Sequence, residues 1–203
     1  MTRVTGATSG ILRAGAIASL FIATVAVAQP HIVRGTIEKI DGSTLTLKQA
    51  QGPDLTVKLL QNAKVFGVKA ASIADIKQGE WIGVGAMPQP DGSQKAIEVT
   101  IFSAAQRGVG EGFRPWTRPG STMTNGTAGS PVAGVDGRIV TVKYKSGEQK
   151  IVIGPDAKIR MYVVGSRDDL KSGVRVSVYN PQKAADGSLQ AARINFGIGD
   201  MVP

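Results

Sequence analysis

An internal repeat is the feature of this sequence that most restricts how the chain can fold. Asp41-Gly-Ser-Thr-Leu-Thr-Leu-Lys48 resembles Asp136-Gly-Arg-Ile-Val-Thr-Val-Lys143, which lies 95 positions later. Two further pairs match at a spacing of 94: Asn62–Val65 with Asp156–Ile159, and Asp75–Gly79 with Asp169–Gly173. The small differences in spacing fall in predicted turns, as expected for a duplicated fold. With only two copies, the pattern indicates tandem duplication rather than a solenoid.

Each copy has the pattern of five short strands and one helical turn. In the first copy we expect strands at residues 33–40, 44–49, 55–60, 80–86 and 95–102. Apolar residues alternate with polar or small ones within these runs, as in half-buried strands: Leu45/Leu47, Val57/Leu59 and Ile82/Val84. Ser72, Asp75 and Gly79 predict a helical turn between the third and fourth strands. Ser166, Asp169 and Gly173 repeat this pattern in the second copy.

Three strands, a short helix and two strands form the order of an OB-type barrel. We therefore expect an all-β protein with two tandem small OB-like β-barrels, each with one short helical turn, joined by a Gly/Pro-rich linker. The predicted divisions are a signal peptide at 1–28, the first barrel at 29–103, a linker at 104–122 and the second barrel at 123–203. One continuous sandwich of about ten strands is the alternative.

The N-terminal segment has the pattern of a secretory signal peptide. Arg3 and Arg13 precede an apolar run that ends in Ala26-Val27-Ala28, and the segment contains no acidic residue. The run is shorter than the roughly 20 apolar residues of a spanning helix, which disfavours the alternative of an uncleaved membrane anchor. We expect cleavage after Ala28, export to the periplasm or the medium, and no transmembrane span in the mature chain.

Composition removes many kinds of chemistry. The chain has no Cys and a single His, which excludes disulfides, thiol catalysis and metal sites built from several histidines. Asp168-Asp169 is the only adjacent acidic pair, and Asp169 is already expected to cap a helical turn. Ser93 and Ser188 follow Asp-Gly dipeptides and lack a histidine partner, so we interpret them as turn residues. We expect no catalytic site, no metal site and no cofactor.

The predicted linker is rich in Gly and Pro, but it also contains Phe113 and Trp116. These rings are expected to hold the linker in a groove between the barrels, because buried aromatic side chains contribute large apolar areas. A ligand contact by Trp116 and the nearby Arg114 is the alternative, since Trp and Arg are favoured at binding hot spots.

Five segments of the chain are distinctive: Val33–Lys39, Ala86–Ser93, Gly110–Trp116, Pro119–Gly126 and Val142–Lys145. They resemble an uncharacterised family of exported bacterial proteins with OB-like domains of unknown function. Together they span nearly all of the mature chain. Relatives are sometimes labelled metal transporter permeases, a label that this sequence contradicts because only the signal segment is apolar enough to span a membrane. The resemblance implies export and an OB-like fold, and no activity.

Basic residues are concentrated in the second copy, which has 11 Lys and Arg against 7 acidic residues, whereas the first copy has 8 against 7. Lys143 and Lys150 are expected on the outer face of a hairpin, next to Tyr144 and Lys145, on the surface that OB-folds use for binding. Trp81 is also expected to face outward, toward the linker, the second barrel or a ligand. The candidate ligand-binding residues are Lys143, Tyr144, Lys145, Lys150, Trp81, Arg114 and Trp116.

These patterns predict an exported, non-enzymatic binding or scaffolding protein of the bacterial envelope. The alternative is a polyanion-binding protein that holds an acidic lipid headgroup or a polysaccharide on the basic face of the second barrel. Nucleic acid is not expected as a partner, because few aromatic residues are available for base stacking. An enzyme is the third possibility, disfavoured by the missing catalytic residues. The sequence leaves the oligomeric state open.

Overall fold

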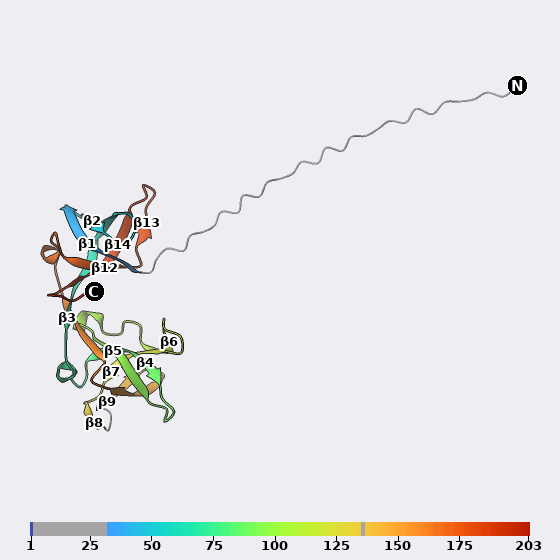
Figure 1. Cartoon of the computed structure of the whole chain (residues 1–203), viewed down its shortest axis with the longest axis vertical. Coiled ribbons are helices and arrows are strands. Elements are labelled where there is room, and N and C mark those ends of the chain that lie inside the picture. Colours follow the sequence, from blue (N-terminus) through green and yellow to red (C-terminus); the bar gives the residue numbers. More distant parts are fainter. Residues whose placement is uncertain (2–31, 135–136) are drawn as a thin grey trace.

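The computed structural model describes residues 1, 32–134 and 137–203 of an all-β protein (Figure 1). The predicted signal peptide, its cleavage position and His31 lie outside the described residues, apart from Met1. No helix in the described part of the chain is long and apolar enough to cross a membrane. The strands are β1 (Ile32–Asp41), β2 (Thr44–Lys48), β3 (Leu55–Ala70), β4 (Trp81–Pro88), β5 (Gln94–Ile101), β6 (Gly112–Pro115), β7 (Thr122–Ala128), β8 (Val132–Gly134), β9 (Gly137–Tyr144), β10 (Gly147–Ile153), β11 (Lys158–Val164), β12 (Arg175–Tyr179), β13 (Gln182–Lys183) and β14 (Leu189–Gly197).

Five of these strands form a closed mixed barrel. Strands β1, β2 and β3 make an antiparallel meander, and β1 also pairs with β12. Strand β12 pairs with β14, which closes the ring by running parallel to β3. Strand β14 follows β3 from Leu189 opposite Val57 to Gly197 opposite Val68, with one register shift between Ala191 and Arg193.

The closed barrel draws on both copies of the repeat, which corrects the expectation that residues 29–103 close by themselves. Its first three strands belong to the first copy, whereas β12 and β14 belong to the second copy. The last two strands of the first copy, β4 and β5, pair instead with β7 and with β10 and β11. Strands of the two copies therefore pair with each other, whereas two tandem barrels would each contain strands from one copy only.

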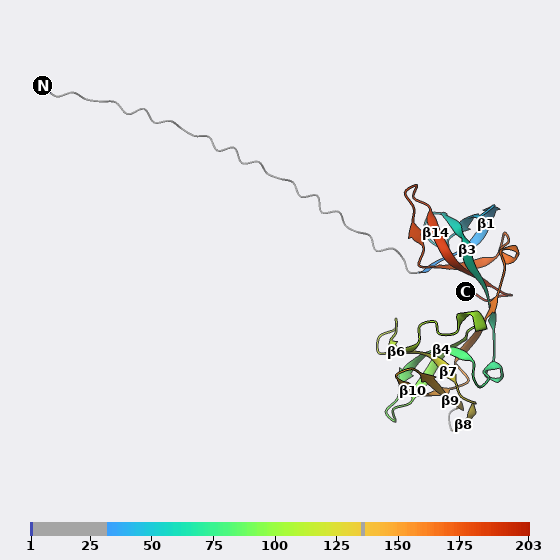
Figure 2. The same ribbon diagram turned by 180° about the vertical axis from the view of Figure 1, so that it is seen from behind.

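The molecule has two lobes (Figures 1 and 2). The first lobe contains the closed barrel, and the second contains β4 to β10. In the second lobe the strands pair in the order β10, β9, β7, β4 and β5, and β5 also runs parallel to β10. Strand β3 is longer than the predicted strand at 55–60, because residues 64–68 continue to pair with β14 and residues 66–70 also pair with β11 between the lobes.

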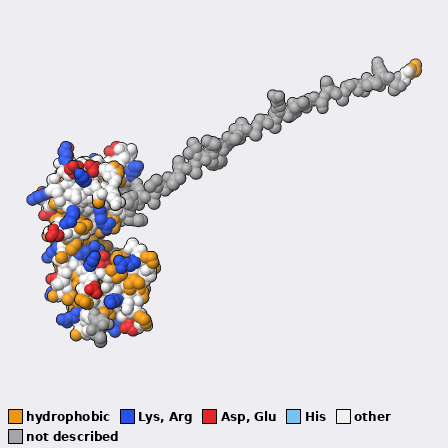
Figure 3. All heavy atoms as spheres, viewed as in Figure 1, with side chains coloured by type: hydrophobic (Ala, Val, Ile, Leu, Met, Phe, Trp, Pro, Cys, Tyr) orange, Lys and Arg blue, Asp and Glu red, His pale blue; other side chains and the backbone are white. Residues whose placement is uncertain are grey.

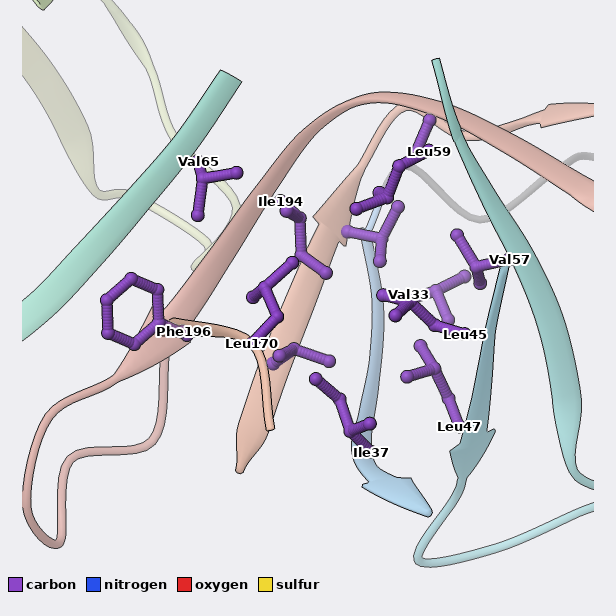
Figure 4. Packing of buried hydrophobic residues seen from close by; sticks show 13 residues of the cluster. Val33, Ile37, Leu45, Leu47, Val57, Leu59, Val65, Leu170, Ile194 and Phe196 are labelled. Carbon is purple, nitrogen blue, oxygen red and sulfur yellow. The ribbon is translucent and has the colours of Figure 1, made fainter. Parts of the chain in front are cut away.

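Each lobe has its own apolar core. The core of the first lobe contains 13 buried residues from β1, β2, β3, β12, β14 and Leu170, several of which Figure 4 shows. The core of the second lobe contains another 12, including Ile82, Val84, Val140 and Ile151. The residues predicted to face inward, such as Leu45, Leu47, Val57 and Leu59 in the first lobe, are all buried. Alternation along the strands therefore identified the core correctly.

The predicted helical turns are confirmed, each as one turn of 3₁₀ helix. They are η1 (Ile73–Asp75) and η3 (Arg167–Asp169), and a third turn, η2 (Ala104–Gln106), follows β5. The Asp75 carboxylate accepts hydrogen bonds from the Ser72 backbone N–H and hydroxyl, both at 2.8 Å. Asp169 accepts the same two bonds from Ser166, at 2.7 and 3.1 Å. The same local sequence therefore forms the same cap in both copies.

The segment predicted as an irregular linker contains a strand. Strand β6 pairs antiparallel with β7, with Phe113 opposite Thr124 and Pro115 opposite Thr122. This pairing leaves Phe113 42% exposed, so Phe113 does not hold the segment in place as expected. Trp116, one residue beyond the strand, is half-buried between the lobes.

Candidate functional site

A cleft of about 530 Å³ lies between the two lobes, and we call it the inter-lobe cleft. Arginines from both lobes line it, and blue side chains gather where the lobes meet in Figure 3. Its volume is in the range of small-molecule sites in proteins. Its charged and aromatic lining residues are Arg34, Glu98, Phe102, Arg114, Trp116, Arg160, Tyr162, Tyr179 and Arg193.

Arg160 on β11 is held by the neighbouring strand. Its NH2 group lies 2.9 Å from Oε1 of Glu98, and its Nε donates to the Thr100 hydroxyl at 2.9 Å. Both partners lie on β5, which runs parallel to β11 and belongs to the other copy of the repeat. The Glu98 and Arg160 side chains are 24% and 29% exposed, so the ion pair fixes the guanidinium at the edge of the cleft.

Arg193 on β14 is held mainly by aromatic rings. Its guanidinium carbon lies 4.7 Å from the ring centroid of Tyr179, 5.3 Å from that of Phe66 and 5.5 Å from that of Tyr162. Its Nε donates to Oδ1 of Asn195 at 3.3 Å. Cation–π contacts restrict the side chain without neutralising its charge. Arg193 therefore presents an oriented cation with no carboxylate partner among the described residues.

Tyr162 lies between the two held arginines. Its hydroxyl is 3.4 Å from the hydroxyl of Tyr179, and its ring contacts that of Phe102 at 5.7 Å between centroids. Burial raises the pKa of the Tyr162 phenol well above its usual value, with the neighbouring Tyr179 acting in the same direction. The charges of Arg160 and Arg193 oppose this increase only partly. At neutral pH the phenol is therefore an uncharged hydrogen-bonding group next to two cations.

Two more arginines line the cleft, one from each lobe. Arg34 on β1 donates from Nε to the main-chain oxygen of Pro203 at 3.3 Å. Arg114 on β6 donates from NH1 to the Gly110 oxygen at 2.8 Å, across a tight turn in which Gly110 has a φ of 59°. Each bond orients its side chain and leaves the positive charge exposed to solvent. The cleft thus has four arginines and one carboxylate, that of Glu98.

Trp116 is positioned by a close approach to the backbone of β4. A Cβ atom at Gly85 would lie 2.5 Å from Cζ3 of the Trp116 indole, so only glycine allows the ring to lie there. The Trp116 backbone N–H donates to the oxygen of Ser121 at 2.9 Å and closes the turn that follows β6. The indole N–H has no hydrogen-bond partner within residues 32–134 and 137–203.

The structure brings two of the predicted site residues into the cleft, Arg114 and Trp116. Trp81 is only 6% exposed, and its indole N–H donates to the Val109 oxygen at 3.2 Å. Trp81 therefore packs against the segment between the repeats, which is one of the positions expected for it.

The other four predicted residues, Lys143, Tyr144, Lys145 and Lys150, lie on or beside the β9–β10 hairpin, away from the cleft. Lys143 pairs with Glu148 at 3.8 Å, and both side chains are well exposed. The Lys145 backbone N–H donates to Oε1 of Glu111 at 2.8 Å. The hairpin is thus an exposed basic surface, and Lys143 and Lys145 have acidic neighbours.

Sequence reasoning missed Arg34, Arg160, Arg193, Tyr162 and Tyr179. One signal was present: Glu98 and Arg193 are 95 positions apart, so the two copies carry opposite charges at equivalent places on β5 and β14. A change of charge sign within a repeat indicates a role that the two copies do not share. No pattern in the sequence showed that both positions face one cleft, because that depends on the exchange of strands between the copies.

The serines considered in the sequence analysis for catalysis lie in hairpin turns. The described residues contain no group of three or more His, Cys, Asp or Glu side chains that could hold a metal ion. Ser93 donates to Asp91 and Ser188 to Asp186, each through the hydroxyl at 2.6 Å, in the predicted Asp-Gly-Ser hairpins. Comparison with known proteins gave no match to a protein-family model, a curated protein or a solved structure.

Proposed function

We propose that this chain is an exported, non-enzymatic binding protein of the bacterial envelope that holds an anionic ligand in the inter-lobe cleft. The observation that carries the proposal is the convergence of four arginines with a single carboxylate on one cleft. Arginine binds carboxylate and phosphate groups through two parallel hydrogen bonds, and a concave wall strengthens its electrostatic field. The predicted signal peptide and the resemblance to an exported family support the location.

A scaffold of two OB-like barrels with exchanged strands is part of this proposal. The five strands of the second lobe pair in the same order as those of the closed barrel, with the parallel pair in the corresponding place. A ligand between the lobes would contact strands from both copies, such as β5 and β14. Such an arrangement suits a rigid binding site, because the supporting strands hold the arginines before the ligand arrives.

The exposed hairpin is the competing location for an anion. Lys143, Lys145 and Lys150 would attract a polyanion, as the sequence suggested, but exposed lysines hold it less firmly because solvent screens their charge. The cleft is favoured because its arginines are oriented by neighbours, as the contacts of Arg160 and Arg193 show. The two locations predict different effects of substitution.

Titration calorimetry with tripolyphosphate tests the proposal. The mature chain is compared with two variants. The cleft variant carries Arg114→Gln and Arg193→Gln, and the hairpin variant carries Gln in place of Lys143, Lys145 and Lys150. We expect the cleft variant to lose at least about tenfold in affinity and the hairpin variant to change by less than about threefold. Affinity of the unaltered chain should fall steeply as salt is added.

Arg193→Lys controls for a structural role of Arg193, since it keeps the charge and loses the planar group; we expect an intermediate affinity. The reverse result, with loss only in the hairpin variant, would assign the anion to the basic face of the hairpin. No binding of tripolyphosphate by the unaltered chain, or binding that salt does not weaken, would refute an anion site. Vesicles of phosphatidylglycerol serve as a second probe, which separates a lipid surface from a soluble anion.

A further inference from the structure

A second basic depression adjoins the inter-lobe cleft. It has a volume of about 370 Å³, shares Glu98 and Trp116 with the cleft, and we call it the outer basin. Its cations are Lys95 on β5, Arg118 after β6 and Lys158 at the start of β11. Because the cleft and the basin meet at Glu98 and Trp116, we treat them as two halves of one groove.

The groove has a strong positive excess. Seven Lys and Arg side chains line it against two carboxylates, those of Glu98 and Asp156, which leaves a formal charge of +5. Of the seven, Arg160 has its charge paired by Glu98. Arg114, Arg193 and the three cations of the outer basin have no ion-pair partner within the described residues. A compact anion in the cleft would leave the charges of the basin uncompensated.

Trp116 gives this groove a flat apolar platform between two sets of cations. Its six-membered ring is held against Gly85, as its close contact with that backbone requires, and its remaining surface lines both halves of the groove. Indole faces pack well against the apolar C–H face of a sugar ring, and an indole N–H can donate to a hydroxyl. The groove thus has cations in the cleft, the indole of Trp116, and cations in the basin. This arrangement is complementary to a chain of sugar rings that each carry an anionic group.

We propose that the ligand is a linear acidic oligosaccharide that crosses Trp116 and places anionic groups in both the cleft and the basin. This inference rests on the proposed function, because it assigns the ligand class of the same site. Single-stranded nucleic acid is the less favoured polyanion, since it requires a row of stacking rings. Here Tyr162 is buried, Tyr179 is covered by Arg193, and Phe102 packs on Tyr162 and against Gly83. Trp116 is the aromatic ring that lines both the cleft and the basin.

Binding of oligogalacturonates of increasing length to the mature chain tests the inference, with quenching of tryptophan fluorescence and calorimetry as readouts. We expect the hexamer to bind at least about tenfold more tightly than the dimer, because only a longer chain reaches both halves. The methyl-esterified hexamer, which has the same rings without the charges, should bind at least about tenfold more weakly than the acid. An oligothymidylate of equal length should bind more weakly than the hexamer.

Substitutions separate the two halves of the groove. A basin variant with Gln at Lys95, Arg118 and Lys158 should bind the dimer as before and bind the hexamer no better than the dimer. Trp116→Ala should weaken hexamer binding by roughly tenfold, and Trp116→Phe should restore part of it. The Gln variant at Lys143, Lys145 and Lys150 is the matched control and should leave the length dependence unchanged.

Four other outcomes of these binding experiments would each contradict a different part of the proposal. Equal affinity for dimer and hexamer would overturn the extended groove, while the anion site in the cleft would stand. Tighter binding of oligothymidylate than of the hexamer would overturn the assignment to an oligosaccharide. Failure of every oligogalacturonate, with tripolyphosphate still bound, would show a compact anion as the ligand. Failure of all the anions would refute the proposed function itself.

Discussion

Val68 and Tyr162 lie opposite each other in the antiparallel pairing of β3 with β11, and they are repeat equivalents, 94 positions apart. The neighbouring pairs are arranged symmetrically about this one: Phe66 faces Val164, the equivalent of Ala70, and Ala70 faces Arg160, the equivalent of Phe66. Adding 94 to positions 66 and 70 gives 160 and 164, so each strand pairs with its own copy around a local two-fold axis. Two-fold axes of this kind relate the partners in strand-exchanged dimers. Here the local two-fold axis relates two segments of one polypeptide.

After cleavage of the chain between the repeats, the two fragments should remain associated. A protease site inserted between Arg118 and Pro119 lies in an exposed loop, and cutting it separates the first copy from the second. We expect the two fragments to elute together in size-exclusion chromatography and to separate only in denaturant, because β12 and β14 complete the barrel that begins with β1. Two independent tandem barrels would separate in native buffer, and that result would contradict the pairing described here.

A core substitution in the second copy should destabilise the lobe that begins with the first copy. Ile194 on β14 is fully buried in the core of the first lobe, beside residues of β1 to β3. Ile194→Ala is expected to lower the free energy of unfolding by about 3 kcal/mol, as measured by urea denaturation. Leu60→Ala, at a position that is 38% exposed, is the control and should cost less than about 1 kcal/mol.

Gly85→Ala should displace Trp116 from its place in the groove. The added methyl group would overlap the indole, because the ideal Cβ position is 2.5 Å from Cζ3. We expect the emission of Trp116 to shift to longer wavelength and tripolyphosphate affinity to fall by a few-fold, roughly threefold. The chain has 2 Trp, so Gly85→Ala in a Trp116→Phe background shows how much of the spectrum belongs to Trp81. Unchanged emission would show that the ring does not depend on Gly85.

Glu98→Gln should strengthen anion binding while weakening the fold slightly. The substitution removes the one carboxylate of the inter-lobe cleft and releases the charge of Arg160. We expect tripolyphosphate affinity to rise by roughly threefold to tenfold. Loss of the partly exposed ion pair should cost about 1 kcal/mol of unfolding free energy. A fall in affinity would mean that Glu98 is needed to position Arg160, and calorimetry at two salt concentrations distinguishes the two effects.

Acid should weaken the Asp-Gly-Ser hairpins. Hydrogen bonds from the Ser93 hydroxyl and backbone N–H lower the pKa of Asp91 below its usual value of 3.8, and Ser188 has the same effect on Asp186. A carboxyl whose pKa is lower when folded stabilises the fold above its unfolded pKa, and this contribution is lost as pH falls through the folded value. Ser93→Ala with Ser188→Ala should therefore raise both pKa values toward 3.8, measured by carboxyl NMR titration. Unchanged pKa values would contradict this assignment.

Local features of the fold could be predicted because they depend on neighbouring residues. The strands, the inward-facing residues such as Leu47 and Val142, and the caps at Ser72 and Ser166 all follow from alternation and short-range hydrogen bonds. The end of β3 was missed, because residues 64–70 are extended through their pairing with β14 and β11, which lie far away in the sequence. Strand β6 was missed for a different reason: its segment shows no apolar alternation, and the turn before its partner β7 contains Gly and Pro.

The sequence by itself therefore determined an all-β chain with an internal repeat and with positive charge concentrated toward its second half. Only the tertiary structure decided which strand completes which barrel, because equivalent strands of the two copies present similar edges to a partner. That exchange brings Arg160 beside Glu98 and Arg193 over Phe66, each pair formed by residues from different copies. The cleft exists only between the folded lobes, and its charge is thus a property of strand pairing that no local pattern contains.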